Sequence, residues 1–107
     1  MDPFIKEIQH INNVDDAINK LKSQTDISPK LYEIINFVIE AHEGQYRKSG
    51  EPYCVHPILV ACITAHFSKD EAIIATALLH DVVEDTNFTL EYVQEKWGID
   101  IAHMVDG

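Results

Sequence analysis

The chain has 107 residues, 46% of them hydrophobic and 24% charged, which fits one soluble globular domain or a piece of one. Its net charge of −10 argues against a partner such as a nucleic-acid backbone, which normally requires a basic surface. There is neither an apolar run of the ~18 residues that a membrane span needs nor an N-terminal signal pattern, so we expect a cytoplasmic protein without a membrane partner.

The spacing of apolar residues predicts helices throughout, without the two-residue period of a strand. Asp2 can cap a first helix with Pro3 at its first position, and Asn13 can cap a second. Ser28-Pro29 is a start signal for a third helix. Its apolar positions recur at i, i+3 and i+4, and they are Leu31, Ile34, Ile35, Val38, Ile39 and Ala41.

A polar loop, punctuated by glycine and proline, follows over residues 42–53. Pro57 is expected at the first position of a fourth helix, which would place His56 at the helix cap. Cys54 and Cys62 lie close by but form no CxxC pair. We expect both to be reduced, partly buried thiols.

The fifth helix is expected to be central. Ser68 with Glu71 three residues later has the pattern of a capping box at its start. From Ala72 to Leu79 only Thr76 has a polar side chain, which predicts a helix buried on nearly every side.

Two more helices follow. Thr89 can cap a sixth that ends at Gly98, and a seventh begins near Asp100. We therefore expect an all-α bundle of short helices. Residues 1–27 would form a helical N-terminal extension, and residues 28–107 the core that holds the site.

Four ionisable residues end the fifth helix: His80, Asp81, Glu84 and Asp85. At ~100° per residue they share one arc, provided that the helix continues through Asp85. An adjacent imidazole and carboxylate can bind a metal, and two carboxylates one turn later can orient a water or take its proton. Three buried carboxylates would need compensation, which favours a divalent metal. The alternative is that Glu84 and Asp85 form a solvated helix end.

A resemblance to a known family rests on three segments. His56 followed by the His80-Asp81 pair resembles the HD-domain metal-dependent phosphohydrolases. More specifically, residues 41–53, His56-Pro57 and residues 77–86 resemble the hydrolase domain of the RelA/SpoT-type alarmone enzymes. The similarity covers about residues 31–107.

The resemblance implies an HD-domain fold around one Mn²⁺ ion, with Fe²⁺ or Zn²⁺ as alternatives. His56, His80 and Asp81 would be the metal ligands, and Glu84 and Asp85 the catalytic pair that positions and activates the attacking water. The implied reaction belongs to the stringent response. It removes the 3′-pyrophosphate of the guanosine alarmones ppGpp and pppGpp, giving GDP or GTP.

Arg47, Lys48 and Ser49 match the nucleotide-binding loop of that family, in which the arginine stacks on guanine. Arginine suits stacking, while lysine and serine can bind phosphate oxygens. The alternative for residues 47–49 is an ordinary surface loop. The alternative for His56 is a structural histidine without a functional role.

The match departs from the family in one respect. The fourth metal ligand of the family, a second aspartate, comes from a later helix, and Asp106 lies too early to replace it. We therefore expect a fragment of a larger bifunctional synthetase/hydrolase, with the HD fold incomplete at its C-terminus. The fragment itself should be weakly active or inactive, and its uncovered apolar faces could allow self-association.

Two other functions stay open from the sequence. One is an HD-type nucleotidase acting on deoxynucleotides, and the other is a regulatory module that binds the alarmone without cleaving it. The remaining histidines are expected to be structural or exposed; they are His10, His42, His66 and His103.

Overall fold

In the computed structural model, which describes residues 2–107, these residues form seven α-helices and no strand. The helices are α1 (Pro3–Ile8), α2 (Val14–Gln24), α3 (Pro29–Ala41), α4 (Val55–Phe67), α5 (Glu71–Asp85), α6 (Leu90–Trp97) and α7 (Ile99–Asp106). The all-α prediction is confirmed.

Four helices start at the predicted caps. The side chains of Asp2, Asn13, Ser28 and Thr89 each accept a hydrogen bond from a backbone N–H in the first turn, over 2.8–3.2 Å. These bonds satisfy donors that have no partner within the helix. Gly98 separates α6 from α7 with φ at +103°, a conformation that favours glycine.

The predicted start of α4 is wrong by two residues. The helix begins at Val55, so His56 lies inside the first turn and not at its cap. The cause is a turn ahead of the helix, in which the N–H groups of Val55 and His56 donate to the carbonyls of Pro52 and Tyr53. The chain is therefore already helical when it reaches Pro57.

The predicted capping box of α5 is also wrong. Asp70 caps this helix, and its Oδ1 accepts from the N–H of Ala72 at 2.9 Å and of Ile73 at 3.4 Å. Ser68 instead ends α4, with an extended backbone. A carboxylate is favoured at a helix N-terminus, because it also meets the positive end of the helix dipole.

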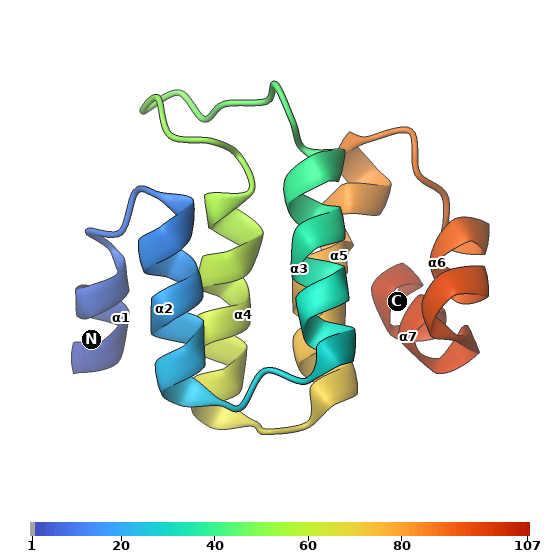
Figure 1. Ribbon diagram of the computed structural model, residues 1–107, viewed down its shortest axis with the longest axis horizontal. Helices are drawn as coiled ribbons and strands as arrows, with labels where there is room; N and C mark the ends of the chain where they lie inside the picture. The colour runs from blue at the N-terminus through green and yellow to red at the C-terminus, as the bar shows by residue number, and fades with distance from the viewer. Residues whose placement is uncertain (1) are drawn as a thin grey trace.

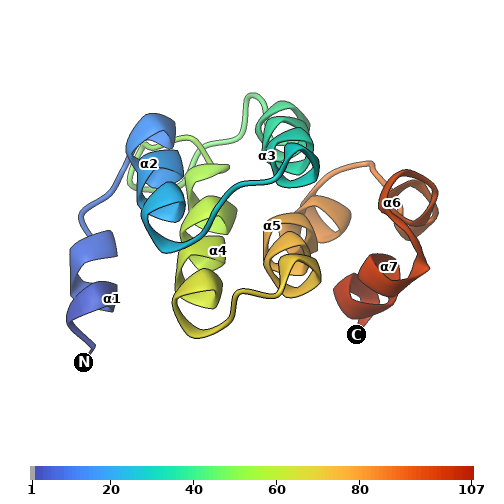
Figure 2. The same ribbon diagram turned by 60° about the horizontal axis from the view of Figure 1, so that its bottom comes forward.

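The helices form a bundle with α4 and α5 at its centre (Figure 1). α4 packs against α2 and α5, and α5 also packs against α3 and α7. α1 lies beside α2 and α4, at the opposite end of the molecule from α6, α7 and the C-terminus (Figure 2). None of the helices within residues 2–107 combines the length and the apolar composition needed to cross a membrane.

The expectation that α5 is buried on nearly every side is wrong for one face. Ile74, Ala75, Leu78, Leu79 and Val82 are buried, as expected for contacts with three neighbouring helices. By contrast, Ile73 is 42% exposed, and Thr76 and Ala77 are half-buried beside an open cleft. That face ends at His80 and gives the site its access to solvent.

Both cysteines are free and buried, which confirms the thiol prediction. The Cys62 thiol donates a hydrogen bond to the carbonyl oxygen of Ala17 on α2, with 3.6 Å between sulfur and oxygen. Burial raises the pKa of Cys62 to about 12, and it also raises the pKa of Cys54.

We predict that both thiols react slowly in the folded chain, because the thiolate is the reactive species and neither sulfur is accessible. At pH 8 a disulfide reagent such as DTNB should modify the folded chain at least ~100-fold more slowly than the chain in denaturant. Rapid reaction of either cysteine before unfolding would contradict the packing of α4.

Candidate metal and nucleotide site

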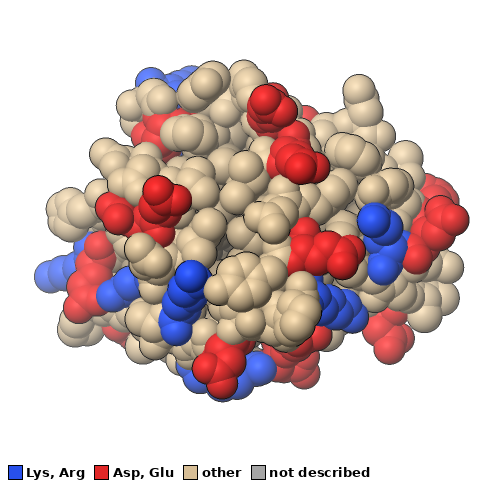
Figure 3. All heavy atoms as spheres, viewed as in Figure 1, with Lys and Arg blue, Asp and Glu red and all other residues tan. Residues whose placement is uncertain are grey.

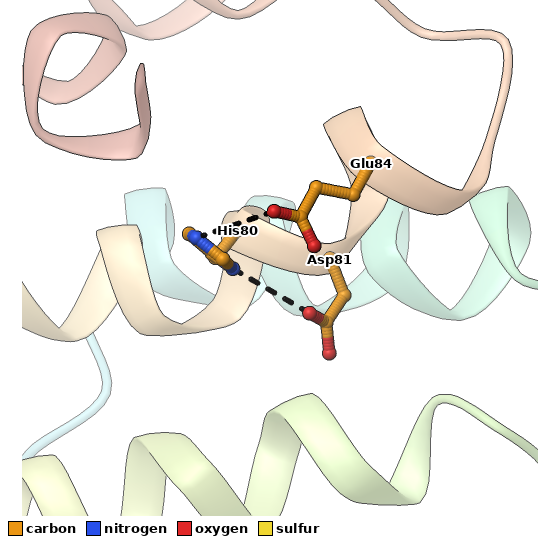
Figure 4. A group of neighbouring side chains, drawn as sticks. All are labelled: His80, Asp81 and Glu84. Carbon is orange, nitrogen blue, oxygen red and sulfur yellow. Dashed lines mark hydrogen bonds and ion pairs between the residues drawn. The ribbon is translucent and has the colours of Figure 1, made fainter. Parts of the chain in front are cut away.

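The last turns of α5 bring three possible metal ligands together. His80 Nδ1 lies 3.5 Å from Asp81 Oδ1, and His80 Nε2 lies 3.8 Å from Glu84 Oε1. One ligand atom from each of the three residues lies within 4.8 Å of the others. Figure 4 shows the three side chains converging from this single helix. The arc predicted for four residues is therefore present for three of them, and Asp85 is not part of this group.

α4 contributes a second histidine to the same place. His56 Nε2 lies 3.6 Å from Asp81 Oδ2. Asp81 thus contacts an imidazole from each helix through its two carboxylate oxygens, with His80 on one side and His56 on the other. Because α4 and α5 pack directly on each other, the relative position of these residues is set by the core.

Asp85 faces a different partner. The Tyr53 hydroxyl donates to Asp85 Oδ2 at 3.0 Å and lies 3.5 Å from Asp81 Oδ2. Burial, followed by the hydrogen bond to Asp85, raises the pKa of Tyr53 to about 12. Tyr53 therefore keeps its proton at neutral pH. It was not among the predicted site residues, although it lies within the segment that carries the family resemblance.

The loop with Arg47, Lys48 and Ser49 is a tight turn. The Arg47 N–H donates to the Glu51 carbonyl at 3.0 Å, and the Gly50 N–H donates to the Arg47 carbonyl at 2.9 Å. Gly50 adopts φ of +101°, which only glycine does at little cost. The backbone thereby holds Arg47, Lys48 and Ser49 exposed at the tip.

Glu51 organises the side chains of this turn. Its Oε1 accepts a hydrogen bond from the Ser49 hydroxyl at 2.7 Å and lies 3.6 Å from Arg47 Nε. The hydrogen bond from Ser49 is the main cause that lowers the pKa of Glu51, and the charge of Arg47 adds to it. The Arg47 side chain therefore contacts Glu51 within the turn while remaining 42% exposed.

Two hollows meet at His56. One, of about 400 Å³, lies under the loop and is lined by Arg47, Lys48, Ser49 and Tyr53. The other, of about 420 Å³, is the cleft between α4 and α5 and reaches His80 and Asp81. A ligand could therefore contact the loop and the carboxylate cluster at once, with His56 between them.

The expected burial of three carboxylates is wrong. Glu84 and Asp85 are exposed and Asp81 is half-buried, because the last turn of α5 borders the open cleft. A metal is therefore not needed to compensate a desolvation cost. The case for a metal rests instead on the convergence of imidazole and carboxylate donors, which is a suitable set for Mn²⁺, Fe²⁺ or Zn²⁺. These residues fit a divalent ion.

Among the described residues, none of the other histidines joins the candidate metal ligands, although the ring of His42 lies 4.9 Å from that of Tyr53. His66 stacks on Phe4 at 4.3 Å and lies 3.5 Å from Asp2, and so it holds α1 against α4. His10 and His103 are exposed. His42 is buried and hydrogen-bonded to Gln45, 2.8 Å from Nδ1 to Oε1. The structural or exposed roles predicted for them are confirmed.

The surface carries charges of both signs. In the face shown in Figure 3, acidic side chains are spread over several helices, with lysine and arginine scattered among them and no continuous basic area. The single arginine of the chain, Arg47, and its neighbour Lys48 are thus local positive charges in an acidic protein.

A comparison with known families decides the identity of the fold. The HD domain matches residues 35–107, a segment that includes the loop, His56 and the whole α5 cluster. The chain belongs to the HD-domain family.

Relatives of this HD domain are about 50% identical to it over the aligned segments. It is 52% identical over 68 residues to the guanosine-3′,5′-bis(diphosphate) 3′-pyrophosphohydrolase of Haemophilus influenzae, covering 64% of this chain and 10% of the relative. It is 50% identical over 82 residues to a GTP pyrophosphokinase of Myxococcus xanthus, covering 77% of this chain and 10% of the relative.

A third relative combines both activities in its name. The bifunctional (p)ppGpp synthase/hydrolase SpoT of Escherichia coli is 48% identical over 68 residues, covering 64% of this chain and 10% of the relative. The resemblance to RelA/SpoT-type proteins is confirmed. The chain spans about a tenth of the length of these relatives.

We predict that Asp81→Asn weakens Mn²⁺ binding more than any other single change in the cluster, because Asp81 contacts both histidines. Loss of one ligand charge should lower the affinity at least ~10-fold, as measured by calorimetric titration. Asp15→Asn, at an exposed position on α2, is the matched control and should bind like the unchanged chain. Equal affinity for Asp81→Asn would exclude Asp81 as a ligand.

Proposed function

We propose that this HD domain hydrolyses the 3′-pyrophosphate of ppGpp and pppGpp, giving GDP or GTP and pyrophosphate. The observation that carries the proposal is the meeting of two hollows at His56, one beside the Arg47 loop and one beside the Asp81 cluster. The names of the relatives support guanosine polyphosphates as the substrate class.

The proposed roles follow from the donor types. His56, His80 and Asp81 would hold Mn²⁺. A Glu84 carboxylate oxygen lies within 4.8 Å of the ligand atoms of His80 and Asp81. When bound, a divalent ion stabilises charge on phosphate oxygens and lowers the pKa of water toward ~7. Glu84 and Asp85 would orient the attacking water and accept its proton, since both are exposed acids in the last turn of α5, which also carries His80 and Asp81.

The reaction needs two proton transfers, because the attacking water loses a proton and the leaving ribose 3′ oxygen gains one. The water oxygen bonds to the phosphorus next to the ribose 3′ oxygen, and that oxygen leaves with a proton as the nucleoside 3′-hydroxyl. A carboxylate that takes the proton of the water can return it to the product. Arg47, Lys48 and Ser49 would bind the nucleotide, with the planar guanidinium suited to stacking on the base.

We predict that the 107-residue chain hydrolyses ppGpp slowly, because His80 and Glu84 at the proposed metal site are more than half exposed and an ion there would be held weakly. Pyrophosphate release should require Mn²⁺, and both chelator and Asp81→Ala should abolish it. The measurement is a single-turnover assay with protein in excess, followed by chromatography of the nucleotides. Release of orthophosphate, or equal cleavage of dGTP, would instead indicate an HD-type nucleotidase.

Turnover at a typical enzyme rate of about 10 s⁻¹ would contradict the prediction of a weak site. Tight binding of ppGpp with Mn²⁺ present but no cleavage by the full-length protein would support the regulatory alternative. Competition between ppGpp, GDP and dGTP then separates alarmone binding from general nucleotide binding.

We also predict that Arg47→Ala lowers the affinity for GDP about 10-fold, through loss of stacking and of one positive charge. Lys30→Ala, which removes a positive charge at an exposed position of α3, is the control and should leave the affinity unchanged. Calorimetry or chemical-shift titration can measure both. If the two variants lose affinity equally, the loop acts only through overall charge.

A further inference from the structure

The site contains a hydroxyl that has no role among the proposed ligands and acids. Tyr53 approaches the end of α5 from the loop and contacts two carboxylates there, Asp85 at 3.0 Å and Asp81 at 3.5 Å. The contact to Asp85 uses only one of its two oxygens, Oδ2.

Tyr53 is itself held on several sides. Its N–H donates to the Gln45 carbonyl at 2.9 Å, which closes the loop. Its ring lies 4.9 Å from the ring of buried His42 and 6.1 Å from that of His56. A ring packed between two histidines has little freedom, so its hydroxyl is directed at the carboxylates.

Asp85 is also fixed through its backbone. Gln45 Nε2 donates to the Asp85 carbonyl at 3.0 Å, and Gln45 Oε1 lies 2.8 Å from His42 Nδ1. The carbonyl of Asp85 is among the last of α5, where carbonyls have no partner within the helix. Thus the loop holds both the main chain and the side chain of Asp85.

We propose that Tyr53 is a positioning residue for hydrolysis, whose hydroxyl anchors Oδ2 of Asp85 so that Oδ1 faces the attacking water. This proposal rests on the proposed function, because it assigns to Asp85 the task of accepting the water proton. A carboxylate at an exposed helix end would otherwise rotate among several orientations. When the hydrogen bond holds the Asp85 carboxylate in one orientation, the rotational entropy is lost before the reaction begins and no longer adds to the barrier.

The test uses four forms of the chain: unchanged, Tyr53→Phe, Asp85→Ala and the double variant. Single-turnover hydrolysis of ppGpp with Mn²⁺ and protein in excess should be about 10-fold slower for Tyr53→Phe, with half-saturating protein concentration within about 2-fold of the unchanged chain. In the Asp85→Ala background the same change should cost little more, because alanine leaves no oxygen at that position to accept the hydrogen bond. Tyr32→Phe, which removes a hydroxyl from an exposed ring on α3, is the matched control.

Three results would overturn the proposal. They are an unchanged rate, an equal fold-loss in the Asp85→Ala background, and a loss that appears only as weaker binding of the nucleotide or Mn²⁺. The last would make Tyr53 a ligand-binding residue and not one that acts through Asp85.

A second measurement does not depend on hydrolysis. Tyr53→Phe and Asp85→Ala break the same hydrogen bond, so their shifts in melting temperature should be less than additive in the double variant. Additive shifts would contradict the Tyr53 proposal whatever the activity. Sub-additive shifts in a chain that cleaves no nucleotide would instead contradict the proposed function.

Discussion

The packing of α4 against α5 is the constraint on which the site depends. The two helices are consecutive and joined by residues 68–70, so they run antiparallel and bring the start of one beside the end of the other. Fully buried alanines, Ala61 and Ala65 on α4 and Ala75 on α5, keep side-chain volume between neighbouring helices small. This arrangement places His56 3.6 Å from Asp81 although 25 positions separate them in the chain. The core therefore determines the distance between the two halves of the metal site.

The loop over residues 42–53 is the second determinant. Its tip presents Arg47, Lys48 and Ser49 in a turn closed by Glu51 and Gly50, and its ends are tied to α5 through Gln45 and Tyr53. The polar residues of this loop therefore have two different surroundings. Those at the tip face solvent and are suited to a nucleotide, while those at the base contact the carboxylates. One segment thus links the proposed nucleotide site to the proposed catalytic acids.

The sequence predicted the local features well. Caps at Asp2, Asn13, Ser28 and Thr89 depend only on neighbouring residues, and all are present. The shared arc predicted for His80, Asp81, Glu84 and Asp85 is present for the first three. The start of α4 and the cap of α5 were wrong, because each position offered competing signals. At α4 a turn from the loop outweighed Pro57, and at α5 the carboxylate of Asp70 outweighed the hydroxyl of Ser68. The burial of α5 was overpredicted, since an apolar composition does not specify which face a neighbour will cover.

By itself the sequence determined which donors lie on one face of α5, because the period of the helix relates residues one and four positions apart. It also determined that a histidine and a basic loop precede them, and the resemblance carried by these segments indicated the HD domain. Only the tertiary structure decided that His56 meets Asp81, that Asp85 turns to Tyr53, and that the cluster stands at the mouth of an open cleft. These distances join separate elements, so they follow from how the helices and the loop pack and cannot be obtained from the spacing of residues along the chain.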